Sequence, residues 1–302
     1  MISRRLFLGT FATGFLGLTS YASAIEPLYR LAVTRYDLPL PGWPKGAKPL
    51  KAALVADIHA VDPWMTLPRI EEIVATTNAL DADIILLLGD YMASIRLKNR
   101  SLMPGEWAPV LAKLKAPLGV HAILGNHDYW WRDGPEPVQR GLEAVGIPVY
   151  MNEGRKITQD GHDFWLTGTT SALSSPLYGF PLGHGIHYGQ DDLKRALAAV
   201  TDDAPILHMA HEPEMIRHMP ERVALTMSGH NHGGQIALPF IGRPAVWMKD
   251  DPSARYMYGQ FNEAGRNLIV SGGLGCSMLP IRFGVPPEIV LLQIRSAANK
   301  LA

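Results

Sequence analysis

The stretch Ile84-Ile85-Leu86-Leu87-Leu88-Gly89-Asp90 joins five large aliphatic residues to a glycine and a carboxylate. An unbroken aliphatic run of this length predicts a strand that is covered on both faces, as in a parallel sheet. Two other runs end in a similar way: residues 50–56 lead into Asp57, and residues 120–124 lead into Gly125-Asn126. The sequence therefore predicts buried strands that are each followed, at the carboxyl end, by a polar side chain.

Outward from these three runs, strand-like and helical segments alternate along the chain. Further strand-like runs occupy residues 147–151, 164–167, 206–210, 223–227, 268–271 and 289–294. The spacing of apolar residues predicts helices at residues 67–80, 107–114, 137–145 and 193–200. This order predicts an α/β fold with two packed mixed β-sheets flanked by helices, a four-layer sandwich. We expect one domain over residues 50–302, because no internal repeat or second boundary is visible.

Composition limits the classes of function. The chain has 302 residues and 47% hydrophobic content, which is enough to bury a sizeable core. Its 28 basic and 28 acidic residues cancel, so no electrostatic feature favours nucleic acid and none is expected as a partner. The single cysteine, Cys276, excludes an internal disulfide and a thiolate-based zinc site.

Residues 1–24 are predicted to be a twin-arginine signal peptide. Ser3-Arg4-Arg5-Leu6-Phe7-Leu8 resembles the twin-arginine motif, and an apolar run leads to the small-residue cleavage signal Ala22-Ser23-Ala24. We expect the twin-arginine export machinery to deliver the protein to the periplasm or cell envelope, with a cut before Ile25. The alternative is an uncleaved membrane anchor, although the run is short and glycine-rich for a transmembrane helix. The proline-rich residues 25–49 are predicted to be an N-terminal connector or edge segment.

Five short stretches carry metal-binding side chains, and each follows a predicted strand. In chain order they are Asp57-Ile58-His59, Gly89-Asp90, Gly125-Asn126-His127-Asp128, His211 and Gly229-His230-Asn231-His232. Ligand sites of open α/β sheets lie beyond the carboxyl ends of the strands, so we expect the five loops to meet on one rim. Carboxylate, imidazole and amide ligands suit Mn²⁺, Zn²⁺ or Fe²⁺. Taken singly, each stretch has an ordinary structural explanation, such as a turn or a core histidine.

This series of motifs resembles the calcineurin-like metallophosphoesterase superfamily over residues 50 to about 294, and the signal with the stretch Leu279-Pro-Ile-Arg-Phe resembles its exported bacterial phosphodiesterases. The resemblance implies two divalent metal ions with a bridging hydroxide as nucleophile. It assigns Asp57, His59 and His232 to one ion, Asn126, His211 and His230 to the other, and Asp90 to both. It also places His127 beside the substrate as a catalytic residue. Asp128 would orient His127 and raise the pKa of its imidazole.

One position departs from the wider pattern of the superfamily. Many relatives carry Asp or Tyr three residues after the bridging aspartate, where this chain has Ala93. A tyrosinate–iron site is therefore not expected. Any support that an aspartate would give must come from another residue.

Apolar residues follow two of the metal-binding stretches: Pro63-Trp64-Met65 and Tyr129-Trp130-Trp131. They either line a mouth suited to a lipid-linked or other amphipathic phosphate ester, or they fill the core. The first alternative would also fit an association with the membrane surface.

Four further residues are candidates for substrate binding. His184 and His187 lie in residues 171–190, which form either an active-site loop or a plain surface loop. Gln235 and Arg282 are the others, and Arg282 would bind phosphate in a bidentate pair unless it forms a structural salt bridge.

The motifs together predict metal-dependent hydrolysis of phosphate esters, by a phosphodiesterase or phosphatase that acts on a lipid-linked or other cell-envelope substrate. The alternative is an exported, non-catalytic metal-binding or scaffold protein with the same fold. His127 favours the enzyme, because a scaffold does not need an acid for a leaving group.

Overall fold

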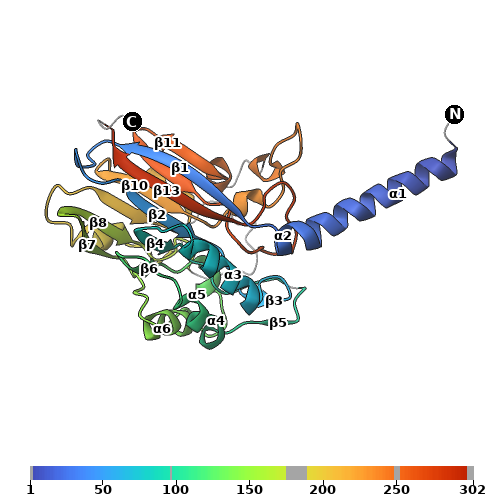
Figure 1. Cartoon of the computed structure of the whole chain (residues 1–302), viewed down its shortest axis with the longest axis horizontal. Coiled ribbons are helices and arrows are strands. Elements are labelled where there is room, and N and C mark those ends of the chain that lie inside the picture. Colours follow the sequence, from blue (N-terminus) through green and yellow to red (C-terminus); the bar gives the residue numbers. More distant parts are fainter. Residues whose placement is uncertain (1–2, 96, 175–188, 248–251, 298–302) are drawn as a thin grey trace.

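The structure is a computed structural model, and it describes residues 3–95, 97–174, 189–247 and 252–297. Two β-sheets form the body of the molecule (Figure 1). A third sheet has two strands, β3 (Val61–Asp62) and β5 (Arg100–Ser101), and it lies at the end of the body near α1.

The first sheet has the strand order β1-β13-β2-β4-β6. Its strands are β1 (Ala32–Leu40), β2 (Leu50–Val55), β4 (Ile84–Leu87), β6 (Val120–Ala122) and β13 (Glu288–Ser296). β2, β4 and β6 run parallel, whereas β13 is antiparallel to β2 and parallel to β1. The carboxyl ends of β2, β4 and β6 therefore lie at the same edge.

The second sheet has the strand order β11-β12-β10-β9-β8-β7. Its strands are β7 (Glu153–Gln159), β8 (His162–Gly168), β9 (Ile206–Met209), β10 (Val223–Ser228), β11 (Gly259–Glu263) and β12 (Arg266–Val270). The four inner strands run parallel, and β7 and β11 are antiparallel edge strands. The strand predicted at residues 147–151 is wrong, since Val149 makes only an isolated bridge to Ala122.

Three apolar clusters hold four layers together. The central cluster lies between the sheets and includes Leu54, Leu86, Leu166 and Met227, all fully buried. Another cluster packs α3 (Leu67–Asn78), α4 (Pro104–Leu111) and α6 (Glu136–Ala144) against the first sheet. The last lies between the second sheet and α7 (Leu193–Leu197), η2 (Pro213–His218) and η5 (Pro252–Tyr256). The predicted fold class, two mixed sheets flanked by helices, is confirmed.

The chain begins with a helical segment that projects from the body (Figure 1). It consists of α1 (Arg4–Ser20), the π-helical turn η1 (Tyr21–Ile25) and α2 (Glu26–Tyr29). The predicted cleavage position before Ile25 falls inside η1. Within the described residues, no helix combines the length and the apolar character needed to cross a membrane.

Candidate metal centre

The loops that follow five parallel strands converge on one side of the two sheets. These strands are β2, β4 and β6 of the first sheet and β9 and β10 of the second. Backbone hydrogen bonds tie the loops to one another: the N–H of Asp57 donates to Gly89 (3.0 Å), and the N–H of Gly229 donates to His211 (3.1 Å). The metal-binding stretches are thereby brought to one place, as the sequence predicts.

The side chains of these loops form two groups of potential ligands that share Asp90. One group contains Asp57, His59, Asp90 and His232, and the other contains Asp90, His211 and His230. Within each group the ligand atoms lie within 4.8 Å of one another. Asn126 lies beside the second group, with its Oδ1 2.9 Å from Nδ1 of His230. All seven residues named as ligands from the sequence therefore meet here.

Hydrogen bonds to backbone carbonyls orient three of the imidazoles. Nδ1 of His59 lies 2.8 Å from the carbonyl of Met92, and Nδ1 of His211 lies 2.6 Å from the carbonyl of Leu88. Nδ1 of His232 lies 3.3 Å from the carbonyl of Gly275. A carbonyl accepts only, so each Nδ1 carries the proton and each Nε2 has a free lone pair. The Nε2 atoms of His59 and His232 then face each other at 3.1 Å, an arrangement that a cation between them would stabilise.

The backbone at the ligands adopts a conformation that side chains usually avoid. Positive φ angles are found at Asp57 (54°), His59 (48°), Asp90 (58°), His230 (71°) and His232 (50°). Each such non-glycine residue costs roughly 1–3 kcal/mol, and this cost is tolerated mainly at functional sites. The packing of both sheets therefore holds these residues in the conformation that aims their side chains at one point.

Gly125 allows the closest approach in the site. A Cβ atom at this position would collide with the carboxylate of Asp90 and with the ring of His211. The N–H of His127, two residues later in α5 (Asn126–Tyr129), donates to Oδ1 of Asp90 at 2.8 Å. A glycine before Asn126 thus lets the loop fold directly over the shared carboxylate.

The charges in the centre perturb one another strongly. Burial and the nearby charge of Asp90 raise the pKa of Asp57 to about 7, against the effect of His211. Burial would also raise the pKa of Asp90, but His211 and His127 hold it well below its usual range. Burial lowers the pKa of His211, but Asp90, Glu212 and Asp57 together raise it well above its usual value, whereas burial lowers the pKa of His59 and of His232. His59 and His232 are therefore neutral and able to bind a metal.

The donor set fits divalent cations. Oδ2 of Asp90 and Nε2 of His211 are buried without a hydrogen bond, although they lie only 3.2 Å apart. A buried polar atom without a partner is costly, and a metal ion would satisfy both atoms at once. Imidazole and carboxylate ligands without a thiolate are typical of Mn²⁺, Zn²⁺ and Fe²⁺ sites.

His127 lies at the mouth of the cluster and is held by two serines that the sequence analysis did not identify. Its Nδ1 lies 2.5 Å from Oγ of Ser94, and its Nε2 lies 3.4 Å from Oγ of Ser277 and 4.0 Å from Oδ2 of Asp90. The ring of Trp130 stands 5.1 Å from the imidazole. Burial lowers the pKa of His127 to about 3, so the expectation of a raised pKa is wrong.

Asp128 has a different function from the one expected. Its carboxylate accepts hydrogen bonds at 2.9–3.0 Å from the backbone N–H groups of Asp90, Tyr91, Met92 and Gly125. Asp128 therefore clamps the loop after β4 to the loop after β6. The expectation that it orients His127 is corrected, because Ser94 contacts Nδ1 of that ring. Ser94 lies one residue beyond Ala93, which is why the family pattern did not point to it.

Two of the substrate-binding candidates are occupied with the protein itself. Arg282 is fully buried, and its guanidinium donates to the carbonyls of Gly275 and Val285. The carbonyl of Gly275 also accepts from Nδ1 of His232, so Arg282 fixes the group that orients this ring and cannot form the expected bidentate pair with phosphate. The amide of Gln235 likewise binds the loop at Ser277 and Leu279.

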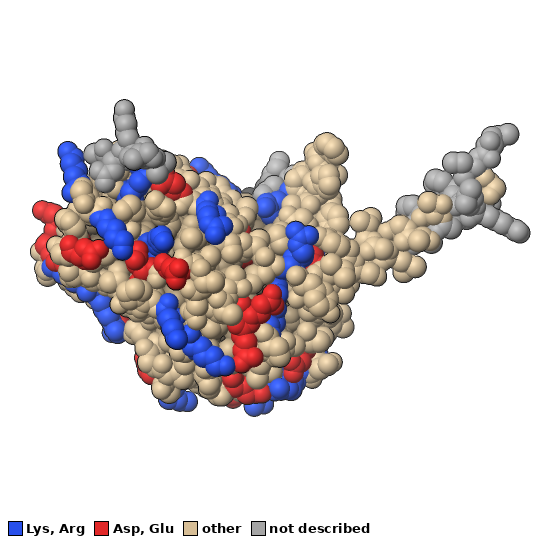
Figure 2. All heavy atoms as spheres, viewed as in Figure 1, with Lys and Arg blue, Asp and Glu red and all other residues tan. Residues whose placement is uncertain are grey.

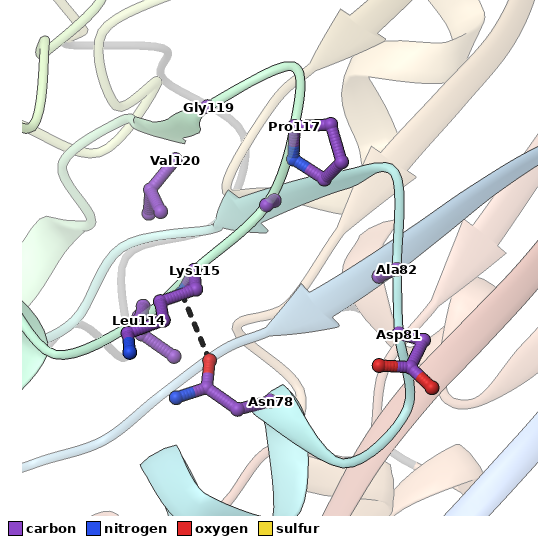
Figure 3. A pocket seen from close by; sticks show the side chains of 9 residues that line it. Asn78, Asp81, Ala82, Leu114, Lys115, Pro117, Gly119 and Val120 are labelled. Atoms are coloured by element: carbon purple, nitrogen blue, oxygen red, sulfur yellow. Dashed lines mark hydrogen bonds between the residues drawn. The ribbon is translucent and has the colours of Figure 1, made fainter.

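The other two candidates, His184 and His187, lie outside the described residues. A surface cavity of about 600 Å³ lies between Asn78, Lys115 and Val120 (Figure 3), and none of its lining residues belongs to the cluster. Its lining residues precede β4 or lie at or before the start of β6, so it lies at the opposite ends of these strands from Asp90 and Asn126.

Comparison with known proteins agrees with this geometry. A family model described as calcineurin-like phosphoesterase matches residues 50–234, which include all five metal-binding stretches. The chain is 29% identical to the uncharacterized metallophosphoesterase YkuE of Bacillus subtilis, over 98% of each chain. It is also 29% identical to the phosphodiesterase YaeI of Escherichia coli, over 97% of this chain and 100% of YaeI. The solved structure of the NAD nucleotidase NadN of Haemophilus influenzae matches 75% of this chain and 51% of its own, with 14% identity and a TM-score of 0.48.

Proposed function

Because the chain belongs to the calcineurin-like phosphoesterase family, we propose that it hydrolyses phosphodiesters with two divalent ions held by the cluster around Asp90. The name of its relative YaeI, a phosphodiesterase, supports a diester substrate. Mn²⁺, Zn²⁺ and Fe²⁺ are the ions that suit these ligands.

The observation that carries the proposal is the shared position of Asp90. Its carboxylate belongs to both groups of ligand atoms, and its Oδ2 lies 3.5 Å from Nε2 of His59 and 3.2 Å from Nε2 of His211. A carboxylate between two sets of imidazole side chains is the arrangement expected for a residue that bridges two ions. Asp57, His59 and His232 would hold one ion, and Asn126, His211 and His230 the other.

When bound, two ions of this kind supply a bridging hydroxide nucleophile at neutral pH and neutralise charge on the phosphoryl oxygens. The chain itself would position the ester and protect the leaving group. His127 would hold a proton at Nε2 for the leaving oxygen. If the hydroxyl of Ser94 donates to Nδ1, the ring proton is on Nε2. Ser277, beside Nε2, marks the place that the leaving group would occupy.

The proposal is tested by metal analysis and turnover of the full chain. Protein loaded with Mn²⁺ is expected to bind two ions and to hydrolyse bis-p-nitrophenyl phosphate faster than p-nitrophenyl phosphate. Asp90→Asn should lower the affinity for both ions and abolish turnover. Asp160→Asn is the matched control, because Asp160 is an exposed aspartate that also has a positive φ (48°) but lies in the turn between β7 and β8.

Two results would contradict the proposal. Binding of a single ion would remove the role of Asp90 as a bridge. Two bound ions without turnover of either ester would favour the non-catalytic scaffold.

We propose further that the protein is exported by the twin-arginine machinery and acts in the periplasm or cell envelope on a lipid-linked phosphate ester. The arginine pair at residues 4–5 supports the route. Replacing both arginines with lysine should leave the protein in the cytoplasm, as cell fractionation would show. Unchanged export would contradict this route.

A further inference from the structure

We propose that the helix α1 and a rim of apolar side chains next to the metal-ligand cluster dock together on a lipid bilayer. In the described part of the chain, large hydrophobic side chains are exposed at few places. Five belong to the N-terminal helical segment: Phe15, Leu16, Leu18, Ile25 and Tyr29. The other five, which we call the apolar rim, are Leu97, Phe240, Ile241, Met278 and Leu279.

The exposure of α1 indicates what covers it. Phe15, Leu16 and Leu18 are 62%, 65% and 57% exposed, although successive helical residues point about 100° apart. No charged residue occurs between Leu6 and Ala24. A groove on a protein partner would cover one face of such a helix, whereas lipid covers every face. We therefore infer that the N-terminal segment stays attached, the alternative to a cut before Ile25, and that α1 enters the apolar part of a bilayer from one side.

Hydrogen bonds attach the base of this helix to the apolar rim. The N–H of Arg282 donates to the carbonyl of Ala22 (2.9 Å), and the carboxylate of Glu26 accepts from the N–H groups of Gly284 (3.0 Å) and Val285 (2.6 Å). Glu26 is buried, so this contact is part of the folded body. The loop that carries Met278 and Leu279 thus moves with the base of α1.

The remaining members of the apolar rim are joined to the same unit. The N–H of Ala237 donates to the carbonyl of Phe283 (2.7 Å), which fixes the turn that carries Phe240 and Ile241. Phe240 is 109% exposed, so its ring has no contact with the body.

The placement of the elements agrees with a single docking surface. Leu97 comes three residues before β5, which pairs with β3, and these strands and α2 are on the side of the body from which α1 projects (Figure 1). Charged side chains of both signs are spread over the visible face of the body, whereas residues 13–20 of α1 carry none (Figure 2). A bilayer that surrounds α1 would therefore also meet the apolar rim.

The rim borders the metal-ligand cluster. Met278 follows Ser277, whose Oγ lies 3.4 Å from His127, and Leu97 comes three residues after Ser94, which holds the same ring. Docking would place the cluster at the level of lipid head groups. If the proposed function holds, the phosphate ester reaches the site from the membrane surface.

Environment-sensitive labels test the docking without reference to metals or turnover. Phe240→Cys and Leu279→Cys are introduced separately into the full chain and labelled with bimane. The buried Cys276 is kept, and the unsubstituted protein shows how much label Cys276 takes up. Vesicles of phosphatidylethanolamine and phosphatidylglycerol should shift the emission of both labels to shorter wavelength. A label at Asp160→Cys, in the exposed turn between β7 and β8, should not shift.

Three outcomes would overturn the proposal. A shift at Phe15→Cys without a shift at positions 240 and 279 would mean that α1 binds lipid alone. No shift at any position would exclude the bilayer. A shift that depends on protein concentration and is unchanged by vesicles would show that a second copy of the chain covers the rim.

A double substitution measures the contribution of the apolar rim. Phe240→Ser with Leu279→Ser should weaken vesicle binding about tenfold or more, since each side chain loses apolar contact with lipid. Both residues are exposed, so the fold should be retained. Unchanged affinity would also overturn the proposal. Metal content and turnover of soluble esters should stay as in the parent, which separates this test from the proposed function.

Discussion

The ring of His127 contacts two hydroxyl groups and, among the described residues, has no hydrogen bond to a carboxylate, and this environment determines what it can do. A carboxylate at Nδ1 would stabilise imidazolium, whereas the hydroxyl of Ser94 orients a neutral ring. Neutral imidazole with its proton on Nε2 can still donate to a leaving oxygen. The benefit is largest when that oxygen is strongly basic.

Substitution of Ser94 should separate esters by their leaving group. Ser94→Ala is expected to slow hydrolysis of an alkyl ester about ten- to a hundredfold, with a much smaller effect on a nitrophenyl ester, because only the alkoxide needs the proton. Ser94→Thr keeps the hydroxyl and should restore most of the rate. The measurement is kcat for both esters together with metal content. Equal losses for both esters, or loss of metal, would show that Ser94 does not act through His127.

Residue types, their position after recognisable strands and the family resemblance were sufficient to name the seven candidate ligands, which the structure brings together. The supporting residues could not be named in this way. Arginine commonly binds phosphate, so the sequence makes Arg282 a candidate. Only its full burial and its hydrogen bonds to Gly275 and Val285 show that it binds the protein itself. The positive φ angles at five ligands are also absent from the sequence pattern, because the tertiary packing imposes them on residues other than glycine.

At the scale of elements, the buried strands were predicted well and the edge strands were not. β2, β4, β9 and β10 are nearly continuous apolar runs, and they were found within one or two residues. β7 and β11 have half-buried or exposed residues along much of their length, so hydrophobicity does not mark them. Residues 147–151 are apolar because they pack under α6 and against the first sheet, although they form no strand.

β9 contains a buried histidine that should make the fold sensitive to acid. His208 is fully buried on the face of the second sheet that also carries Ile206 and Ala210, with Nδ1 2.7 Å from Oγ1 of Thr167, and burial lowers its pKa to about 3. The unfolded chain binds a proton near pH 6.5 and the folded chain does not. Stability is therefore unaffected above pH 6.5 and falls as the pH drops from there toward 3.

Denaturant unfolding at pH 7.5 and pH 5.0, in EDTA, measures this effect. Between pH 7.5 and pH 5.0 the free energy of unfolding of the wild type should fall by about 2 kcal/mol more than that of His208→Gln. The difference follows from about 1.36 kcal/mol for each pH unit below 6.5. His162→Gln, at the less buried start of β8, is the control and should behave like the wild type. If His208→Gln loses as much stability as the wild type, the buried imidazole is not the cause.

For the molecule as a whole, the metal-ligand cluster joins the two sheets. Its ligands come from loops after β2, β4 and β6 on one sheet and after β9 and β10 on the other. An unfolded chain separates these side chains widely, so the ions should bind the native state far more tightly. Metal at a hundred times its dissociation constant would add about 2.7 kcal/mol of stability.

The melting temperature should therefore rise with Mn²⁺ and fall when EDTA removes the metal. Asp90→Asn provides the comparison, because the variant lacks the shared ligand and should melt at nearly the same temperature in both conditions. Calorimetry of the two proteins with and without EDTA makes the measurement. If EDTA does not change the melting temperature of the wild type, the cluster does not bind metal in the folded state.

The strand order of the first sheet has a consequence for synthesis on the ribosome. β13 is inserted between β1 and β2, although it is translated after every other strand that the structure describes. A nascent chain that still lacks this segment leaves β1 and β2 without their shared neighbour, and the sheet stays open. Folding is then largely post-translational, and a transport system that accepts only finished, folded cargo would suit a protein built in this order.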